Sequence, residues 1–328
     1  MRDIFKKIRN KGFLGTLKAL AHRIKFYAII STKTLIDPFK RVSLYSNIRK
    51  ESFQVAFPHE GGMVINLPHV SFFDIFWGFG VCTKRNIDYL SRPLCESLLR
   101  RIVFELYESG YINNNLSIVD VGCWIGDNSI VWAKYLSGAN LYAIDPSQEN
   151  LDYVQILARS NSINNICSVR GVCAASRGRR LGYYGSLDHT SFHNLSSDRY
   201  EESTTIDYIV GKAGATIGLL HVDVEGLELE VLKGSRAVIS RDLPVIIFEQ
   251  HISTERVGDI VEYLARFDYK IFMINEVLPG CALDCRNFLA LPVSKGVPSL
   301  KDFIQYEGYR IGIFSAVVGG PLVELKAP

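Results

Sequence analysis

The chain of 328 residues has no long hydrophobic run and no cysteine pair at metal-binding spacing. Without a stretch of about 18 apolar residues, the sequence predicts no membrane-spanning helix. Its seven cysteines include no C-x-x-C pair, and Cys281 and Cys285 lack a second pair or histidine cluster to complete a zinc site. An odd number of unpatterned cysteines is typical of a reducing compartment, so we predict a cytoplasmic protein.

The chain has no excess of positive charge outside its first fifty residues. Residues 1–50 hold thirteen Lys or Arg against Asp3 and Asp37, which leaves the rest of the chain near −8 although the whole carries +3. Apolar residues of 13–28 recur at helical spacing, with basic residues mostly on the other side. We predict a basic amphipathic helix that either contacts an anionic membrane surface through residues 1–30 or packs on its own domain.

Two further classes are disfavoured by what the basic segment lacks. Charges interrupt its apolar stretch and no small-residue cleavage site follows, which argues against a secretory signal. The basic residues form no motif with interleaved aromatics, so we predict no nucleic-acid partner.

The chain also lacks the G-x-G-x-x-G fingerprint of dinucleotide sites. Instead, a strand-like run at 117–121 leads into Gly122 and Gly126, and a second apolar run at 141–144 ends in Asp145. Such a strand–turn–helix–strand unit is typical of a site for an adenosine-containing cofactor, with Asp145 accepting the ribose hydroxyls. The missing glycine disfavours a pyrophosphate and favours a phosphate-free cofactor such as S-adenosylmethionine. The predicted cofactor contacts are Asp120, Gly122, Cys123, Gly126, Asn128, Ser129, Asp145, Pro146 and Asp223.

Strands alternate with helices from residue 117 onward, which indicates right-handed crossovers and a mostly parallel sheet. The pattern predicts strands at 117–121, 141–144, 166–172, 217–223, 245–249, 270–274 and 287–291. It predicts helices at 127–137, 148–161, 206–211, 226–239 and 254–267, and upstream a strand at 63–67 and a helix at 94–108. Residues 173–205 show no clear period, and within them 182–196 is either a substrate lid or a plain surface loop.

Chemically active side chains follow the fourth and fifth predicted strands. Asp223 and Glu225 end one strand and His251 ends the next. Because the carboxyl ends of parallel strands meet at one edge of a sheet, these residues are expected beside the cofactor turn. Two close carboxylates shift each other's pKa and histidine titrates near neutrality, so His251, Asp223 and Glu225 are the candidate catalytic bases. A structural histidine, or a divalent metal on Asp223 with Glu249 or His251, is the alternative; we predict no metal.

Together these motifs resemble the FkbM-type S-adenosylmethionine-dependent methyltransferases. The specific marker is the D-V-E-G-x-E block from Asp223, which ends in V-L-K-G at Gly234; the glycine turn and the Asp145-Pro146 pair accompany it. The resemblance covers about residues 117–292. It implies a class I methyltransferase (Rossmann-like) α/β fold, with helices on both faces of a seven-stranded, mostly parallel sheet that has one antiparallel strand. It also implies methyl transfer to an oxygen of a sugar, glycan, lipid or secondary metabolite.

The chain departs from the family pattern at three places. Cys123-Trp124 stand where Ala-Asn is common, His221 replaces a common Lys, and residues 1–60 match nothing in the family. We divide the chain into a basic N-terminal segment (1–60), a helical lead-in (61–115), the methyltransferase domain (116–292) and a C-terminal extension (293–328). The alternative to an enzyme is a non-catalytic S-adenosylmethionine-binding module, or one recruited to a membrane for assembly. The partner expected for the enzyme is a small-molecule or glycan acceptor.

Overall fold

The computed structural model describes the core of the chain and parts of its flanks. The described residues are 53–57, 62–67, 89, 92, 96–184, 191–192, 200–251, 256–276, 285–296, 298, 310–311 and 315–325. The predicted N-terminal amphipathic helix and most of the predicted lid at 182–196 lie outside them.

A central sheet organises the described residues. Its strands in chain order are β3 (Ser117–Val121), β4 (Leu141–Asp145), β5 (Ile166–Arg170), β10 (Ile217–Val222), β11 (Val245–His251), β12 (Tyr269–Glu276), β13 (Cys285–Pro292), β14 (Arg310–Ile311) and β15 (Ser315–Leu325). In space they follow the order β14-β15-β12-β13-β11-β10-β3-β4-β5. β5, β4, β3, β10 and β11 are parallel, and β13 is antiparallel to both β11 and β12. The seven predicted strands are present, with β13 antiparallel to its neighbours, but the sheet is larger than predicted, because β15, antiparallel to β12, and β14 extend it to nine strands.

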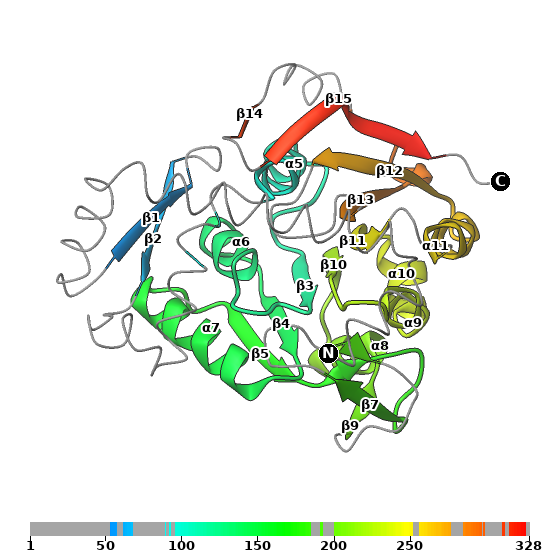
Figure 1. Ribbon diagram of the computed structural model, residues 1–328, viewed down its shortest axis with the longest axis horizontal. Helices are drawn as coiled ribbons and strands as arrows, with labels where there is room; N and C mark the ends of the chain where they lie inside the picture. The colour runs from blue at the N-terminus through cyan, green and yellow to red at the C-terminus, as the bar shows by residue number, and fades with distance from the viewer. Residues whose placement is uncertain are drawn as a thin grey trace, which may run out of the picture.

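Helices cover both faces of the sheet (Figure 1). One face carries α5 (Ser97–Glu108), α6 (Ser129–Tyr135) and α7 (Gln148–Ser160). The other carries α8 (Ile206–Ala213), α9 (Glu228–Lys233), α10 (Arg236–Asp242) and α11 (Arg256–Ala265). Each face buries its own cluster of aliphatic and aromatic side chains, so the strands are apolar on both sides, as expected for a parallel sheet.

Side-chain caps begin two of the described helices. Ser147 caps α7, accepting a hydrogen bond from the Asn150 amide at 3.2 Å, and Thr205 caps α8. The helix predicted at 226–239 is instead two helices, α9 and α10, which break at Gly234-Ser235. A Cβ on Gly234 would lie 2.1 Å from the carbonyl oxygen of Ala174, so the close approach of another segment accounts for this glycine.

A small second sheet occupies the region where the sequence shows no period. Its strands are β6 (Val172–Cys173), β7 (Arg180–Tyr184), β8 (Ser191–Phe192) and β9 (Tyr200–Thr204), in the order β6-β9-β7-β8. Arg170 joins it to the end of β4, since its Nε donates to the Pro146 carbonyl at 3.2 Å and its guanidinium pairs with Glu201 at 2.7 Å. Arg179 pairs with Glu230 of α9 at 3.2 Å. The small sheet is therefore fixed at the carboxyl edge of the central sheet.

A β-hairpin from the N-terminal part of the chain packs against α6 and α7. It comprises β1 (Phe53–Phe57), which the sequence analysis missed, and β2 (Met63–Leu67), which it predicted. Lys134 Nζ donates to the Val64 carbonyl at 2.6 Å, and the amide of Asn66 donates to Asn161 Oδ1 at 2.7 Å.

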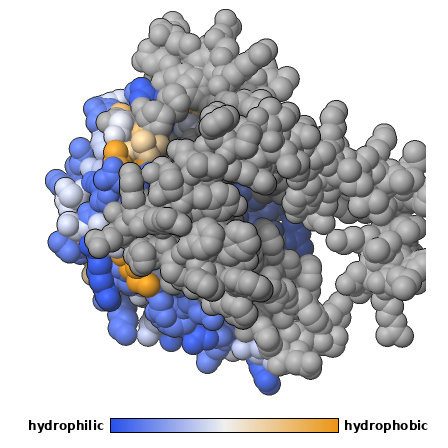
Figure 2. All heavy atoms as spheres, turned by 60° about the vertical axis from the view of Figure 1, so that its left-hand side comes forward, coloured by the Kyte–Doolittle hydropathy of each residue, from blue (hydrophilic) through white to orange (hydrophobic). Residues whose placement is uncertain are grey.

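The described surface is mainly hydrophilic on the face shown in Figure 2, with small hydrophobic spots. The large apolar side chains are otherwise gathered in the two buried clusters. Over the described residues, no helix combines the length and the hydropathy needed to cross a membrane.

Candidate functional site

The turn after β3 is tightly packed against its own chain. Gly122 and Gly126 have φ values of 81° and 75°, which favour glycine. A Cβ on Gly122 would lie 1.7 Å from the Asp223 carbonyl oxygen, and one on Gly126 would lie 2.8 Å from Val154 Cγ2. Both glycines are therefore required by backbone conformation and close packing, in addition to any room that they leave for a ligand.

Asp145 presents a buried, oriented carboxylate at the end of β4. Its Oδ2 accepts a hydrogen bond from the Trp124 amide at 3.1 Å. Its Oδ1 accepts from the Ser147 amide at 2.8 Å and from Asn150 Nδ2 at 2.9 Å. These contacts tie the cofactor turn to the next βα turn and hold the carboxylate in one orientation.

Cys123 and Trp124, which depart from the family pattern, have different environments. Cys123 is 3% exposed within the apolar cluster, and burial, together with Asp145 and Asp120, raises the pKa of its thiol well above the usual value. It is a neutral packing residue. Trp124 is only partly buried, and the Arg92 guanidinium lies 4.4 Å from its ring centre. Trp124 is thus the member of the pair that a ligand can reach.

Asp120 joins β3 to β10 and to α6. Its Oδ1 lies 2.8 Å from His221 Nδ1, and its Oδ2 accepts a hydrogen bond from Ser129 Oγ. All three residues are buried, and Asp120 and Ser129 contact each other. That these two residues also contact the cofactor stays a prediction. Burial lowers the pKa of His221, but the Asp120 hydrogen bond and charge, then Asp223 and Glu96, raise it to about 9. His221 is therefore an imidazolium at neutral pH.

A second buried network meets Asn128 at the start of α6. Asn128 Nδ2 donates to Glu96 Oε2 at 3.0 Å, and Arg100 donates to Asn128 Oδ1 at 3.3 Å. Asn287 of β13 donates to Glu96 Oε1 at 3.0 Å. The sequence analysis assigned no role to Glu96, Arg100 or Asn287. The sequence did contain a signal for this network: Glu96 and Arg100, which have opposite charges, lie one helical turn apart in a mostly apolar stretch.

The candidate bases gather at the ends of β10 and β11. Burial, then Glu249 and Glu96, raise the pKa of Asp223 well above its usual value, which suits a carboxylate that accepts a proton. Glu225 is exposed with a φ of 53°, and His251 is the half-buried last residue of β11. The structure thus brings all three to one edge, with Asp223 and His251 half-buried and Glu225 exposed. No group of three or more His, Cys, Asp or Glu side chains is placed to hold a metal within the described ranges.

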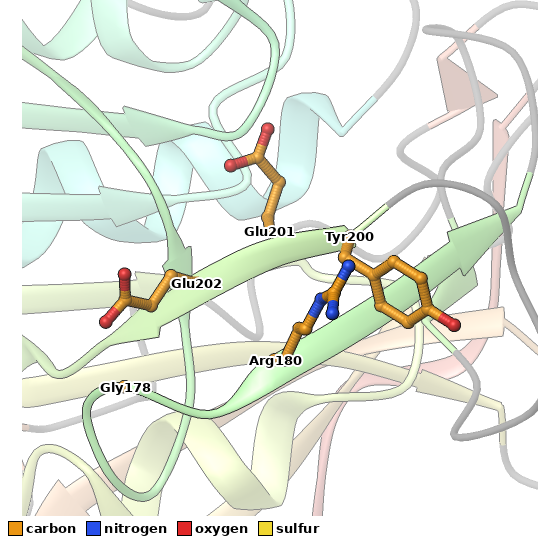
Figure 3. A pocket seen from close by; sticks show the side chains of 5 residues that line it. All are labelled: Gly178, Arg180, Tyr200, Glu201 and Glu202. Carbon is orange, nitrogen blue, oxygen red and sulfur yellow. The ribbon is translucent and has the colours of Figure 1, made fainter.

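A separate hollow of about 510 Å³ lies on the small sheet (Figure 3). Its lining residues are Gly178, Arg180, Tyr200, Glu201 and Glu202. The Arg180 guanidinium lies 4.2 Å from the Tyr200 ring centre, and Figure 3 shows the two side chains next to each other. Arg180 pairs in register with Glu202, so charges of both signs and an aromatic face border this hollow.

Comparison with known proteins identifies the domain that holds the turn. Residues 120–271 match the family model described as the methyltransferase FkbM domain. No curated protein matches the chain significantly.

Solved structures overlap the chain in part. A methyltransferase FkbM from Methylobacillus flagellatus KT is 21% identical, with 54% of this chain and 44% of that chain covered and a TM-score of 0.41. The chain therefore spans less than half the length of that relative. A precorrin 8W decarboxylase from Methanobacterium thermoautotrophicum is 18% identical, with 60% and 89% covered and a TM-score of 0.39. A SAM-dependent methyltransferase from Aquifex aeolicus is 12% identical, with 66% and 100% covered and a TM-score of 0.38. The assignment of the methyltransferase domain rests on the sheet order and the family match. It does not rest on these partial overlaps with solved structures.

The site fits the cofactor that this family implies. Asp145 offers an oriented, buried carboxylate for ribose hydroxyls, and beside it Asn150 Oδ1 is buried without a hydrogen-bond partner among the described residues. Both groups accept hydrogen bonds, which is what the hydroxyl and amino donors of an adenosine need. Residues 120–271 thus match the methyltransferase FkbM domain, the central sheet has the strand order of a class I methyltransferase, and the cofactor that this match implies is S-adenosylmethionine.

Proposed function

We propose that this protein is an O-methyltransferase that methylates a hydroxyl of a sugar, glycan, lipid or secondary metabolite. One observation carries the proposal: a half-buried carboxyl group with a raised pKa, Asp223, belongs to the segment whose backbone touches the glycine turn at Gly122. A carboxyl group whose proton affinity is raised therefore lies beside the cofactor turn. That is what methylation of a hydroxyl needs and what methylation of an unprotonated amine or thioether does not.

The chemistry is a direct displacement. S-adenosylmethionine supplies a methyl group on a sulfonium, and the electron pair of the breaking S–C bond stays on sulfur. Asp145 and the turn at Trp124 would hold the cofactor's ribose end, and Asp223 would take the proton of the acceptor hydroxyl as its oxygen bonds to the methyl group. Alignment of the two reactants supplies much of the rate, because the methyl group is already activated. His251, on the neighbouring strand, is the second candidate base.

The hollow on the small sheet supports a polar acceptor. Tyr200 is 42% exposed and carries Arg180 beside its ring, and Glu202 lies opposite Arg180. An aromatic face bordered by hydrogen-bonding groups of both signs suits the apolar faces and hydroxyls of a sugar. Because Arg170 anchors this sheet to Pro146, the hollow is attached to the same edge as the cofactor turn.

The test combines binding with turnover. Isothermal titration with S-adenosylmethionine and its demethylated product measures the cofactor site, and release of labelled methyl groups over a panel of hydroxylated acceptors measures catalysis. We expect Asp223→Asn to lose at least 100-fold in kcat. Asp152→Asn, which changes an exposed carboxylate on α7, is the control and should retain most activity. Cofactor binding without turnover on any acceptor would instead favour the non-catalytic module.

A further inference from the structure

Glu96 lies outside the matched family domain yet inside its buried polar network. It precedes α5, it is 8% exposed, and its φ of 50° is left-handed. Such a backbone is costly for a residue with a side chain and persists where the surrounding structure holds it. Here the holding groups are the side-chain amides of Asn128 and Asn287, each 3.0 Å from a different carboxylate oxygen.

Those two amides come from opposite sides of the transfer site. Asn128 follows the cofactor turn that leaves β3, whereas Asn287 is on β13, and β10 and β11 lie between these strands. Neighbouring strands are about 4.8 Å apart, so β3 and β13 are separated by about 14 Å. The Glu96 carboxylate is therefore hydrogen-bonded on one side to the start of α6 and on the other to Asn287, which pairs in register with Glu249 of β11. Asp223 lies next to Glu249, because the residues before them, Val222 and Phe248, pair in register.

Charged groups surround Glu96 on several elements. Burial by itself would raise the pKa of its carboxyl, but His221 on β10, then Arg100 on α5, the Asn287 hydrogen bond and Arg92 lower it below the usual value. Glu96 is therefore a buried carboxylate that stays ionised, because positive groups compensate its desolvation.

The neighbouring carboxyl responds in the opposite direction. Burial is the largest cause of the raised pKa of Asp223, followed by the charges of Glu249 and Glu96, with a further contribution from Glu225 and opposition from His221. The charge of Glu96 is thus one of the causes that raise the pKa of the Asp223 carboxyl group.

We propose that Glu96 is a positioning residue of the methyl-transfer site, a role that rests on the function proposed above. Its hydrogen bonds tie the start of α6 to β13 across the ends of β10 and β11. Its negative charge lies near Asp223 and makes that carboxylate a stronger proton acceptor. Glu96 itself does not touch the acceptor; it acts through Asp223.

The decisive variant is Glu96→Gln, which keeps the shape of the side chain and removes its charge. Without that charge, the rising limb of kcat/KM against pH should move to lower pH by about one unit, since Asp223 then ionises more easily. Glu96→Asp keeps the charge and should restore the limb to within about 0.3 units of its original position. A matched control is Glu276→Gln, because Glu276 is also buried on this face but is hydrogen-bonded to the first amides of α5. The rising limb of kcat/KM against pH should stay in place in this variant.

The same shift is measurable without turnover. An ionised Asp223 favours the cationic sulfonium of S-adenosylmethionine, so cofactor affinity should rise with pH, and Glu96→Gln should move this rise downward by the same amount. The neutral demethylated product should show a weaker pH dependence. If no acceptor is methylated but the affinity curve shifts, the proposed function fails and the role of Glu96 stands. If neither curve shifts, or if Glu96→Gln lowers activity equally at every pH, Glu96 is only structural and the inference is overturned.

Discussion

The carbonyl oxygen of Asp223 occupies the place that a side chain on Gly122 would need. The two residues are about a hundred positions apart in the chain, yet a Cβ on Gly122 would lie 1.7 Å from that oxygen. The contact joins the end of β3, with its cofactor turn, to the end of β10, with its candidate base. The D-V-E-G block and the glycine turn are therefore two halves of one packed unit.

Gly122→Ala should destabilise the fold. The substitution combines a left-handed backbone, which costs about 1–2 kcal/mol, with overpacking, which costs about 1–3 kcal/mol. We expect the free energy of unfolding, measured by urea denaturation, to fall by about 2–5 kcal/mol. Gly138→Ala is the control, since a Cβ there meets open space. A Gly122→Ala variant as stable as the Gly138→Ala variant would show that the turn can relax.

Asp145→Asn should weaken cofactor binding without unfolding the protein. The carboxylate accepts hydrogen bonds through both oxygens, and an amide can no longer accept at one of these positions. Loss of a hydrogen bond to a charged group corresponds to about a 10- to 100-fold rise in Kd by calorimetry. Asp152→Asn, at an exposed position of α7, is the control and should leave Kd unchanged. If both variants raise Kd equally, Asp145 does not belong to the cofactor site.

His221 should make stability depend on pH. Its pKa in the folded state, about 9, is above its usual 6.5, so the folded form binds more protons between these values. The stabilisation is complete below about pH 6.5 and is lost as pH rises through 9, a change of about 3 kcal/mol. Denaturant titrations from pH 6 to 10 should show this decline, and His221→Gln should flatten it. A flat curve for the unaltered protein in this window contradicts a charged His221.

Tyr200→Ala should weaken acceptor binding and leave the chemical step intact. Loss of the aromatic wall of the hollow is expected to raise KM for a glycan acceptor about fivefold, with kcat unchanged. Tyr208→Ala is a close control: Tyr208 is equally exposed at 42% and also carries an arginine, Arg177, over its ring, but it does not line the hollow. Equal KM values for the two variants would place the acceptor elsewhere.

The basic N-terminal segment can be tested independently of the enzyme. If residues 1–30 contact an anionic membrane surface, deleting them should abolish co-sedimentation with liposomes that contain acidic lipids. High salt should have the same effect on the full chain, because the attraction is electrostatic. Unchanged co-sedimentation after the deletion would leave packing on its own domain as the role of this segment.

The sequence predicted the central sheet well because its signals are local. The apolar runs at 117–121 and 141–144 and the Ser147 cap each determine structure within a few residues. The same approach missed β1, the split between α9 and α10, and the strands of the small sheet. Those features depend on partners distant in sequence, such as the Ala174 carbonyl packed against Gly234.

The amino-acid sequence by itself thus determined the fold class, the cofactor turn, and the strand ends that carry Asp145, Asp223 and His251, since periodicity and turn chemistry are written in short segments. Only the tertiary structure decided which polar residues meet. It paired Asp120 with His221, brought Glu96 between Asn128 and Asn287, and placed Asp223 near other carboxylates. Burial and long-range charge set the protonation of a side chain, and neither quantity exists until distant segments pack together.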